Sequence, residues 1–229
     1  MRYLAIILLM LSCTKESPNK VDVACVELDG KRVGKGKPTP IEVSPATFSI
    51  LFDIDGHYVN DPSWNSGVPF YAEPSGVFDT LNTFKLVREK FKFFNISLTT
   101  NESEWMKFTY KARCIITTSD FYPNVAGVAY TNSLKNGTDF FVFSDRLYYD
   151  VGRIGYCIAH ESGHSIGLSH QALWDANCNL LSSYNSGSNG IAPIMGNAVG
   201  KNGLWWIGAT PYGCKDIQND SLKMVSYLK

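Results

Sequence analysis

Apolar residues recur at three- and four-residue spacing between residues 77 and 94, which is the period of one face of an α-helix. A helix with this pattern must bury its apolar stripe against a core. We therefore expect an amphipathic helix starting near Val77, with a core-facing stripe formed by Leu81, Phe84, Val87, Phe91 and Phe94.

Short apolar and aromatic runs bounded by Gly, Pro, Asn or Asp predict strands on both sides of this helix. The first of them stops at Asp55-Gly56, a pair typical of turns. The predicted strands are residues 46–53, 95–100, 113–118, 127–131 and 139–144.

A second helix is predicted at residues 151–167, and the chain beyond it is rich in Gly, Asn and Ser. Residues 182–190 are not expected to hold regular structure, whereas a short closing helix is expected at 217–227. The order strand, helix, strands, helix favours an α+β or α/β layer followed by an irregular C-terminal subdomain.

Composition indicates a globular chain and removes one class of partner. Hydrophobic residues make up 45% of the 229 residues and charged residues 18%, which is too apolar for a disordered protein. The 21 Lys and Arg balance 21 Asp and Glu and form no basic run, so the clustered cations that bind phosphates are missing from the sequence. We therefore expect one globular domain and no nucleic-acid partner.

The first residues resemble an export signal. Arg2 precedes the apolar run Leu4–Leu11, which is too short for a membrane-spanning helix of about 20 residues. Leu11-Ser12-Cys13 resembles a bacterial lipobox, in which Cys13 becomes the lipidated first residue; an ordinary secretory signal cleaved nearby is the alternative. The chain then divides into a lipoprotein signal peptide (1–12), a flexible leader, tether or short pro-segment (13–40) and one domain (41–229). The expected location is a bacterial membrane, at the outer membrane or cell surface, or the extracellular medium after release.

The cysteines fit an exported protein in part. If Cys13 carries lipid, five remain, an odd number, so at least one is unpaired. Cys178 and Cys214 both lie among Gly-, Asn- and Ser-rich loops, where an oxidising compartment favours pairing, and we predict a disulfide between them. Cys157 lies on an apolar helical face and is predicted to be a buried thiol.

The candidate chemistry lies in residues 160–170, HESGHSIGLSH. His160 and His164 are four residues apart on a predicted helix, so they project from one face and can reach one metal ion. Gly167 can adopt positive φ at little cost, end the helix and bring His170 to the same ion. Three imidazoles around a tetrahedral zinc leave one position for water, as in catalytic zinc sites.

Glu161 adjoins the first ligand and is not needed to bind the metal. It can accept a proton from a zinc-bound water that attacks a carbonyl and return it to the departing amine. The pattern therefore predicts peptide-bond hydrolysis with one catalytic Zn²⁺ and no covalent intermediate. The motif uses three of the four histidines; the fourth, His57, is expected to be an ordinary surface or hydrogen-bonded residue.

These residues resemble the metzincin consensus HExxHxxGxxH, and Met195, 25 residues after His170, resembles the Met-turn of that clan. Further segments from about Thr47 to the C terminus are similar to secreted bacterial reprolysin-like or matrixin-like metallopeptidases. The resemblance implies an α+β metzincin fold with an α/β-like upper half. A twisted mixed sheet, an active-site helix and a backing helix would form this half, and an irregular subdomain would follow Gly167.

The resemblance also implies roles for other residues. Gly127, Val128, Ala129 and Tyr130 would form the sheet edge above the cleft, where an extended protein or peptide substrate can pair; a plain strand is the alternative. Met195 would form a hydrophobic floor below the metal. The implied enzyme is a monomeric zinc metalloendopeptidase, attached to the membrane through lipid on Cys13.

Two departures from the better-known subfamilies leave the subfamily unassigned. Gln171 follows the third histidine where several subfamilies have Ser, Asp, Glu or Pro. Asn197 replaces the tyrosine that astacin-like and serralysin-like enzymes use as an extra ligand or oxyanion partner.

Other interpretations stay open at this point. The leader can act as an inhibitory pro-segment through Cys25, Asp22 or Asp29. The domain can be a catalytically inactive metal-binding or adhesion module, against which the intact Glu161 argues, or a zinc hydrolase that acts on cell-wall peptides or other amides. The sequence does not decide whether calcium supports the loops.

Overall fold

A computed structural model describes residues 4–8 and 46–229. The predicted lipidation site Cys13, the leader 13–40 and its residues Asp22, Cys25 and Asp29 lie outside the described residues. The division of the chain into signal, leader and domain therefore stays a prediction.

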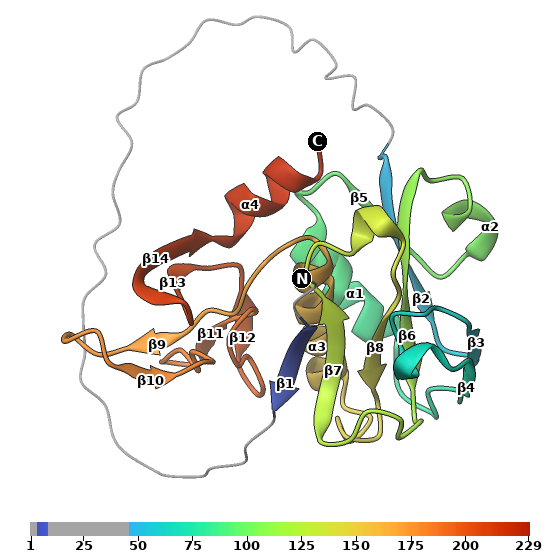
Figure 1. Cartoon of the computed structure of the whole chain (residues 1–229), viewed down its shortest axis with the longest axis horizontal. Coiled ribbons are helices and arrows are strands. Elements are labelled where there is room, and N and C mark those ends of the chain that lie inside the picture. Colours follow the sequence, from blue (N-terminus) through green and yellow to red (C-terminus); the bar gives the residue numbers. More distant parts are fainter. Residues whose placement is uncertain (1–3, 9–45) are drawn as a thin grey trace, which may run out of the picture. The chain divides into compact units, whose positions relative to one another are not determined.

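A six-stranded mixed sheet forms the centre of the described domain (Figure 1). Four strands run parallel, β7 is antiparallel to β8, and β1 is antiparallel to β7. The predicted strands are confirmed, with ends that differ by at most three residues. In sheet order the strands are β1 (Leu4–Leu8), β7 (Val125–Tyr130), β8 (Phe140–Phe143), β6 (Tyr110–Thr117), β2 (Phe48–Asp53) and β5 (Ile96–Thr99).

Two helices pack against each other and cover one face of this sheet. They are α1 (Thr80–Phe91) and α3 (Val151–Ser165), and α3 contacts β7 and β8. Asp79 caps α1 by accepting a hydrogen bond from the Asn82 N–H, so the helix begins three residues later than expected. The expectation that Leu81 belongs to the apolar stripe is wrong: it lies in the first turn and is 75% exposed, and the first buried residue of the helix is Thr83. The predicted pair of active-site and backing helices is confirmed.

Successive residues of the sheet face two different apolar clusters. Ile116 faces the helices, whereas Ile115 faces a second cluster on the opposite side. There Trp64 and the hairpin β3 (His57–Val59) and β4 (Phe70–Ala72) cover the sheet. Both faces are buried, which explains why the strands are continuous apolar runs. Short helices lie in the connections: η1 (Asn65–Gly67), α2 (Glu102–Trp105) and η2 (Leu134–Asn136).

The region after α3 is built from two-stranded sheets and one helix. The sheets pair β9 (Leu173–Trp174) with β10 (Leu180–Ser182), β11 (Ile191–Pro193) with β12 (Asn202–Leu204), and β13 (Ile207–Thr210) with β14 (Gly213–Asn219). The expected helix at 217–227 is wrong at its start: Asn219 caps α4 (Asp220–Tyr227), and the residues before it belong to β14. The predicted disulfide between Cys178 and Cys214 is confirmed, and Cys157 is a buried free thiol as predicted.

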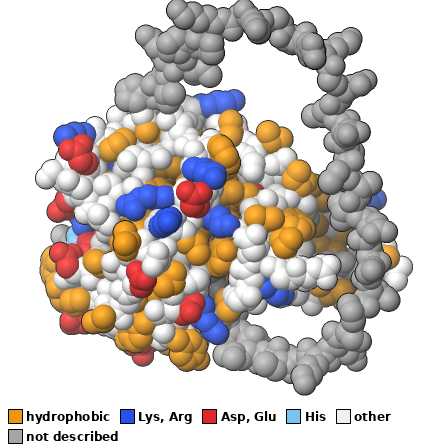
Figure 2. Space-filling model, turned by 180° about the vertical axis from the view of Figure 1, so that it is seen from behind, with side chains coloured by type: hydrophobic (Ala, Val, Ile, Leu, Met, Phe, Trp, Pro, Cys, Tyr) orange, Lys and Arg blue, Asp and Glu red, His pale blue; other side chains and the backbone are white. Residues whose placement is uncertain are grey.

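The surface seen in Figure 2 intersperses Lys and Arg with Asp, Glu and apolar side chains. Among the described residues, none of the helices combines the length and the apolar character needed to cross a bilayer.

Candidate metal centre

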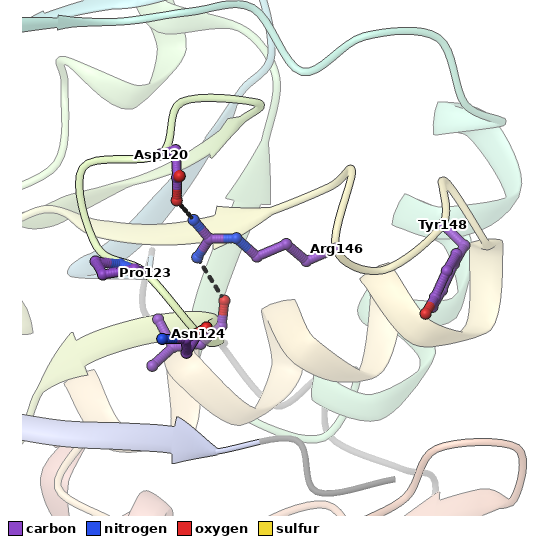
Figure 3. A pocket seen from close by; sticks show the side chains of 6 residues that line it. Asp120, Pro123, Asn124, Arg146 and Tyr148 are labelled. Carbon is purple, nitrogen blue, oxygen red and sulfur yellow. Dashed lines mark hydrogen bonds and ion pairs between the residues drawn. The ribbon is translucent and has the colours of Figure 1, made fainter.

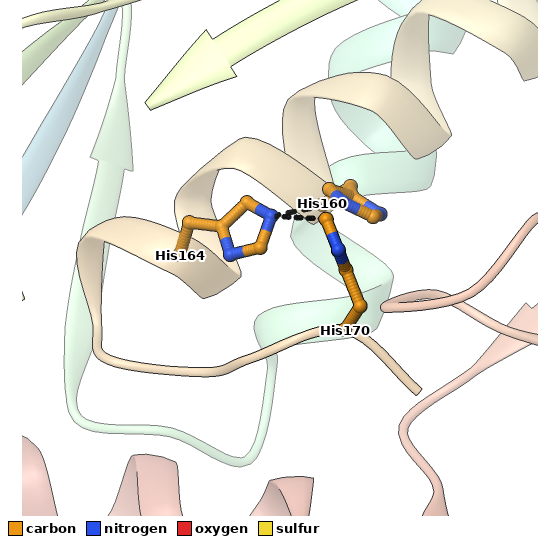
Figure 4. A group of neighbouring side chains, drawn as sticks. All are labelled: His160, His164 and His170. Carbon is orange, nitrogen blue, oxygen red and sulfur yellow. Dashed lines mark hydrogen bonds between the residues drawn. The ribbon is translucent and has the colours of Figure 1, made fainter. Parts of the chain in front are cut away.

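Three histidine side chains converge at the end of α3 (Figure 4). His160 and His164 project from adjacent turns of the helix, and their Nε2 atoms are 3.0 Å apart. His170 comes from the segment after the helix and places its Nε2 3.0 Å from that of His164. In the described part of the chain, this is the one group of His, Cys, Asp and Glu side chains arranged to hold a metal ion.

Gly167 lies where the chain leaves the helix. Its φ is +101°, a conformation that side-chain-bearing residues rarely adopt. A Cβ at this position would overlap Oδ1 of Asn132, whose backbone N–H donates to the carbonyl of His164 at 3.0 Å. The glycine therefore permits both the turn toward His170 and the close approach of the chain that caps the end of α3.

Backbone carbonyls fix the protonation of the two helical imidazoles. Nδ1 of His160 lies 2.7 Å from the carbonyl oxygen of Ile194, and Nδ1 of His164 lies 2.8 Å from that of Leu168. A carbonyl only accepts, so each Nδ1 carries the proton and each Nε2 presents a lone pair. Two lone pairs 3.0 Å apart cannot hydrogen-bond with each other. Ligand nitrogens at about 2.0–2.1 Å from a shared zinc ion lie about 3.4 Å apart, so a small outward movement lets the cluster hold a cation.

Burial keeps these imidazoles neutral. It lowers the pKa of His160 to about 4 and that of His170 to about 3, and it lowers the pKa of His164 well below its usual range. Neutral imidazole is the form that binds a metal. The residues present therefore fit a zinc ion.

Glu161 lies fully buried on the same helix, and neither of its carboxylate oxygens has a hydrogen-bond partner among the described residues. Burial raises the pKa of this carboxyl well above its usual range. A buried carboxyl without partners is costly unless a cation or a water accompanies it. A Cβ on Gly127 would lie 2.8 Å from Oε1 of Glu161, so this carboxyl packs directly against the backbone of β7.

Met195 packs against the same helix at Gly163. A Cβ on Gly163 would lie 2.5 Å from the Met195 sulfur, and Met195 is fully buried. Its neighbour Ile194 provides the carbonyl that orients His160. The segment Ile194-Met195 thus contacts His160 through its backbone and α3 through the side chain of Met195.

Gly127, Val128, Ala129 and Tyr130 lie in β7 as expected, but β7 is not the outermost strand. Gly127 and Val128 pair with β8 on one side, and β1 pairs along the other side of β7. The N–H and C=O groups of β7 that point away from β8 pair with the apolar run Leu4–Leu8, which forms an antiparallel strand beside β7. The expectation that β7 forms the edge is therefore corrected for the chain that still carries residues 4–8.

Several residues around the site were missed in the sequence. The ring of Tyr184 lies with its centroid 4.3 Å from that of His170. Gln218 and Asp220 form hydrogen bonds on either side of His170. No spacing rule connects residues so far apart along the chain. His57, expected to be ordinary, is half-buried with Nδ1 3.5 Å from an Asp53 carboxylate oxygen.

A cavity of about 470 Å³ lies at the start of β7 (Figure 3) and includes none of the three histidines. Its two charged residues are Arg146 and Asp120. Arg146 donates to the carbonyls of Tyr122 and Val125 at 2.6 and 2.7 Å and pairs with Asp120. The guanidinium thus binds acceptors of the protein itself. We therefore assign Arg146 a structural role, holding the start of β7 in place.

Comparison with known proteins agrees with this geometry. Residues 80–171 match Metallo-peptidase family M12B, Reprolysin-like, a stretch that covers less than half of the chain and runs from the start of α1 to just past His170. None of the curated proteins matches the chain. Over residues 80–171 the chain is thus similar to the reprolysin-like metallopeptidases, and together with the three-histidine cluster this similarity supports a zinc peptidase.

Proposed function

We propose that the protein is a zinc-dependent endopeptidase of metzincin type in which Glu161 is the general base. One observation carries this proposal: three neutral imidazoles converge at the end of α3, and Glu161, which follows the first of them on that helix, has a buried carboxyl with no partner among the described residues. A structural zinc site would be closed by a fourth protein ligand, whereas here the cluster offers three.

His160, His164 and His170 would hold the ion. When bound, zinc supplies Lewis acidity, which lowers the pKa of a water molecule and polarises a carbonyl group. Its positive charge would also favour the ionised form of Glu161.

Glu161 would then act in two proton transfers. As a carboxylate it accepts a proton from the attacking water, and as a buried acid it donates that proton to the departing amine. Burial helps the second transfer, because desolvation raises the pKa of this carboxyl and makes the protonated form stable until the amine leaves. The close contact with Gly127 restricts where the carboxyl can lie.

Protein or peptide substrates would pair with β7 through Gly127, Val128, Ala129 and Tyr130. The antiparallel pairing of β1 supports this part of the proposal, because it is main-chain pairing by an extended apolar segment. Removal of residues 1–12 as an export signal would leave the same edge open for a substrate. Pairing through the backbone gives affinity without demanding a particular sequence.

We further propose that the protein is an exported, monomeric lipoprotein anchored through Cys13. The Cys178–Cys214 disulfide supports export, because such bonds persist in oxidising compartments. Replacing Cys13 by Ser should move the protein from the membrane fraction to the soluble exported fraction and abolish labelling by a radioactive fatty acid. Unchanged membrane association would contradict the anchor.

The test of the enzymatic proposal is the Glu161→Gln variant, which keeps the shape of the side chain and removes the base. We expect at least a hundredfold loss of casein degradation with one zinc per molecule retained. His160→Ala should lose both the zinc and the activity. Glu104→Gln, an exposed position that pairs with Lys107, is the matched control and should keep both.

Other outcomes decide between the alternatives. Degradation of casein by Glu161→Gln at the wild-type rate would remove Glu161 from the mechanism. A wild-type protein that binds zinc but cleaves neither casein nor cell-wall peptides would favour the inactive surface module, and cleavage of cell-wall peptides alone would favour the other hydrolase.

A further inference from the structure

The third histidine lacks the anchor that the other two ligands have. Nδ1 of His160 and Nδ1 of His164 each meet a backbone carbonyl, whereas Nδ1 of His170 makes no hydrogen bond to any described residue. His170 also lies outside the helix and is only half-buried. Its position therefore depends on what holds the backbone on either side of it.

The side-chain amide of Gln218, in β14, holds the residue before His170. Gln218 Oε1 accepts from the Ser169 N–H at 2.9 Å, and Gln218 Nε2 donates to the Ser169 carbonyl at 2.8 Å. These two bonds satisfy both main-chain groups of Ser169, as a neighbouring strand would. Gln218 is only 5% exposed, so water competes little for them.

The residue after His170 belongs to the same network. Gln171 is fully buried, and its Nε2 donates to Asp220 Oδ1 at 2.7 Å and to the Gln218 carbonyl at 3.2 Å. The Gln171 backbone N–H donates to the carbonyl of Met195 at 2.8 Å. The segment is thus held on both sides of the ligand.

Asp220 ties the two glutamine side chains together. Its Oδ1 accepts from Gln218 Nε2 at 2.9 Å as well as from Gln171, and its Oδ2 accepts from the Trp206 N–H at 2.9 Å. Asp220 is fully buried at the first position of α4. A buried carboxylate that accepts three hydrogen bonds fixes the orientation of the amides that donate them.

We propose that Gln218 is a positioning residue for the third metal ligand, and that Asp220 and Gln171 hold it in that role. This inference rests on the proposed zinc site. Without the Gln218 amide, the main-chain N–H and C=O of Ser169, next to His170, lose their two hydrogen bonds. His160 and His164 keep their own carbonyl partners. Substitution of residues that orient metal ligands typically weakens metal binding 10- to 100-fold.

The experiment uses the full chain with Gln218→Met, which keeps the length of the side chain and removes the two hydrogen bonds to Ser169, together with those to Asp220 and Lys223. Zinc affinity is measured by competition with a chromogenic chelator, and ligand geometry by visible absorption of the cobalt(II)-substituted protein. Ser144→Ala is the matched control: Ser144 is fully buried and donates to the carbonyls of Ser75 and Thr117, in the sheet region. Urea unfolding of both variants gives the loss of stability.

We expect Gln218→Met to bind zinc 10- to 100-fold more weakly than the wild type and to show an altered cobalt spectrum. Ser144→Ala should lose stability but keep the zinc affinity within about twofold and the spectrum unchanged. If Gln218→Met does not fold, Gln218→Asn, which shortens the amide by one methylene, is expected to change affinity and spectrum in the same direction.

A folded Gln218 variant with wild-type affinity and spectrum would overturn the inference, as would an equal loss of affinity in Ser144→Ala. A wild-type chain that binds no zinc would instead refute the proposed function, so the two failures are distinguishable.

Discussion

The two sides of the metal centre are held by different means. Up to Gly167 the chain is regular, and α3 fixes His160 and His164 through its own period and its packing on β7 and β8. After Gly167 the chain forms two-stranded sheets, and His170 depends on the side-chain amide of Gln218, which comes from β14. Two ligands thus follow from local helical geometry, and the third follows from contacts that are distant in sequence. A perturbation of the region after Gly167 should therefore weaken zinc binding before it destabilises the sheet.

The largest effect on stability and zinc binding is expected from Gly167→Ala, at the point where the two regions meet. An alanine must adopt φ near +101°, and its Cβ would overlap Asn132 Oδ1. We expect a loss of about 4 kcal/mol in the free energy of unfolding and the loss of zinc at micromolar concentration. Urea unfolding measures the free energy of unfolding, and metal analysis measures the bound zinc.

Gly200→Ala provides the control for this change. Gly200 also has positive φ, +70°, but a Cβ there meets nothing within 4 Å. This variant should lose only about 1 kcal/mol and keep its zinc. If both variants lose the same stability and keep the same zinc content, the positive φ alone sets the cost, and the close approach of Asn132 contributes nothing.

The next largest effect is expected from replacing Cys178 and Cys214 together by Ser. The disulfide closes a loop with a sequence separation of 36 in the second region, so its removal should cost about 3–4 kcal/mol. Hydrogen exchange should rise in β13 and β14 well before it rises in β2 and β6. Uniform loss of protection across both regions would mean that they unfold as one unit. Reduction of the wild-type protein by dithiothreitol should reproduce the double variant.

The smallest effect is expected in the first region, from Asp139→Asn. Burial raises the pKa of Asp139 from 3.8 to about 6, so between these values the native state binds a proton more tightly than the unfolded chain does. This stabilisation is fully present below about pH 4 and is lost as the pH rises through 6, a change of about 2–3 kcal/mol. Asparagine can still accept the hydrogen bond that the Arg113 N–H donates to Oδ1. The variant should therefore lack this pH dependence and gain stability over the wild type at pH 7.5.

Urea unfolding at pH 4.5 and pH 7.5 checks the Asp139 prediction, and zinc affinity should not change. A variant less stable than the wild type at pH 7.5 would show that the attraction between the Asp139 carboxylate and the positive charge of Arg113 outweighs the cost of burial.

The predictability of the molecule from its sequence follows the same division. Periodicity and spacing located α3, the sheet strands and the set of three histidines, because each depends on residues within a few turns of one another. The starts of α1 and α4 were assigned wrongly, because Asp79 and Asn219 cap these helices through local hydrogen bonds that apolar periodicity does not report. The network of Gln171, Gln218 and Asp220 could not be predicted, since its members join only when β14 folds back beside the segment after α3.

Met195 reaches the underside of α3 because Gly163 leaves room for its sulfur. The two positions, 32 residues apart in the sequence, therefore share one fixed volume. A larger residue at 163 requires a smaller one at 195, and a change at either position alone overfills or empties the space. In related sequences these two sites should vary as a pair or stay constant together.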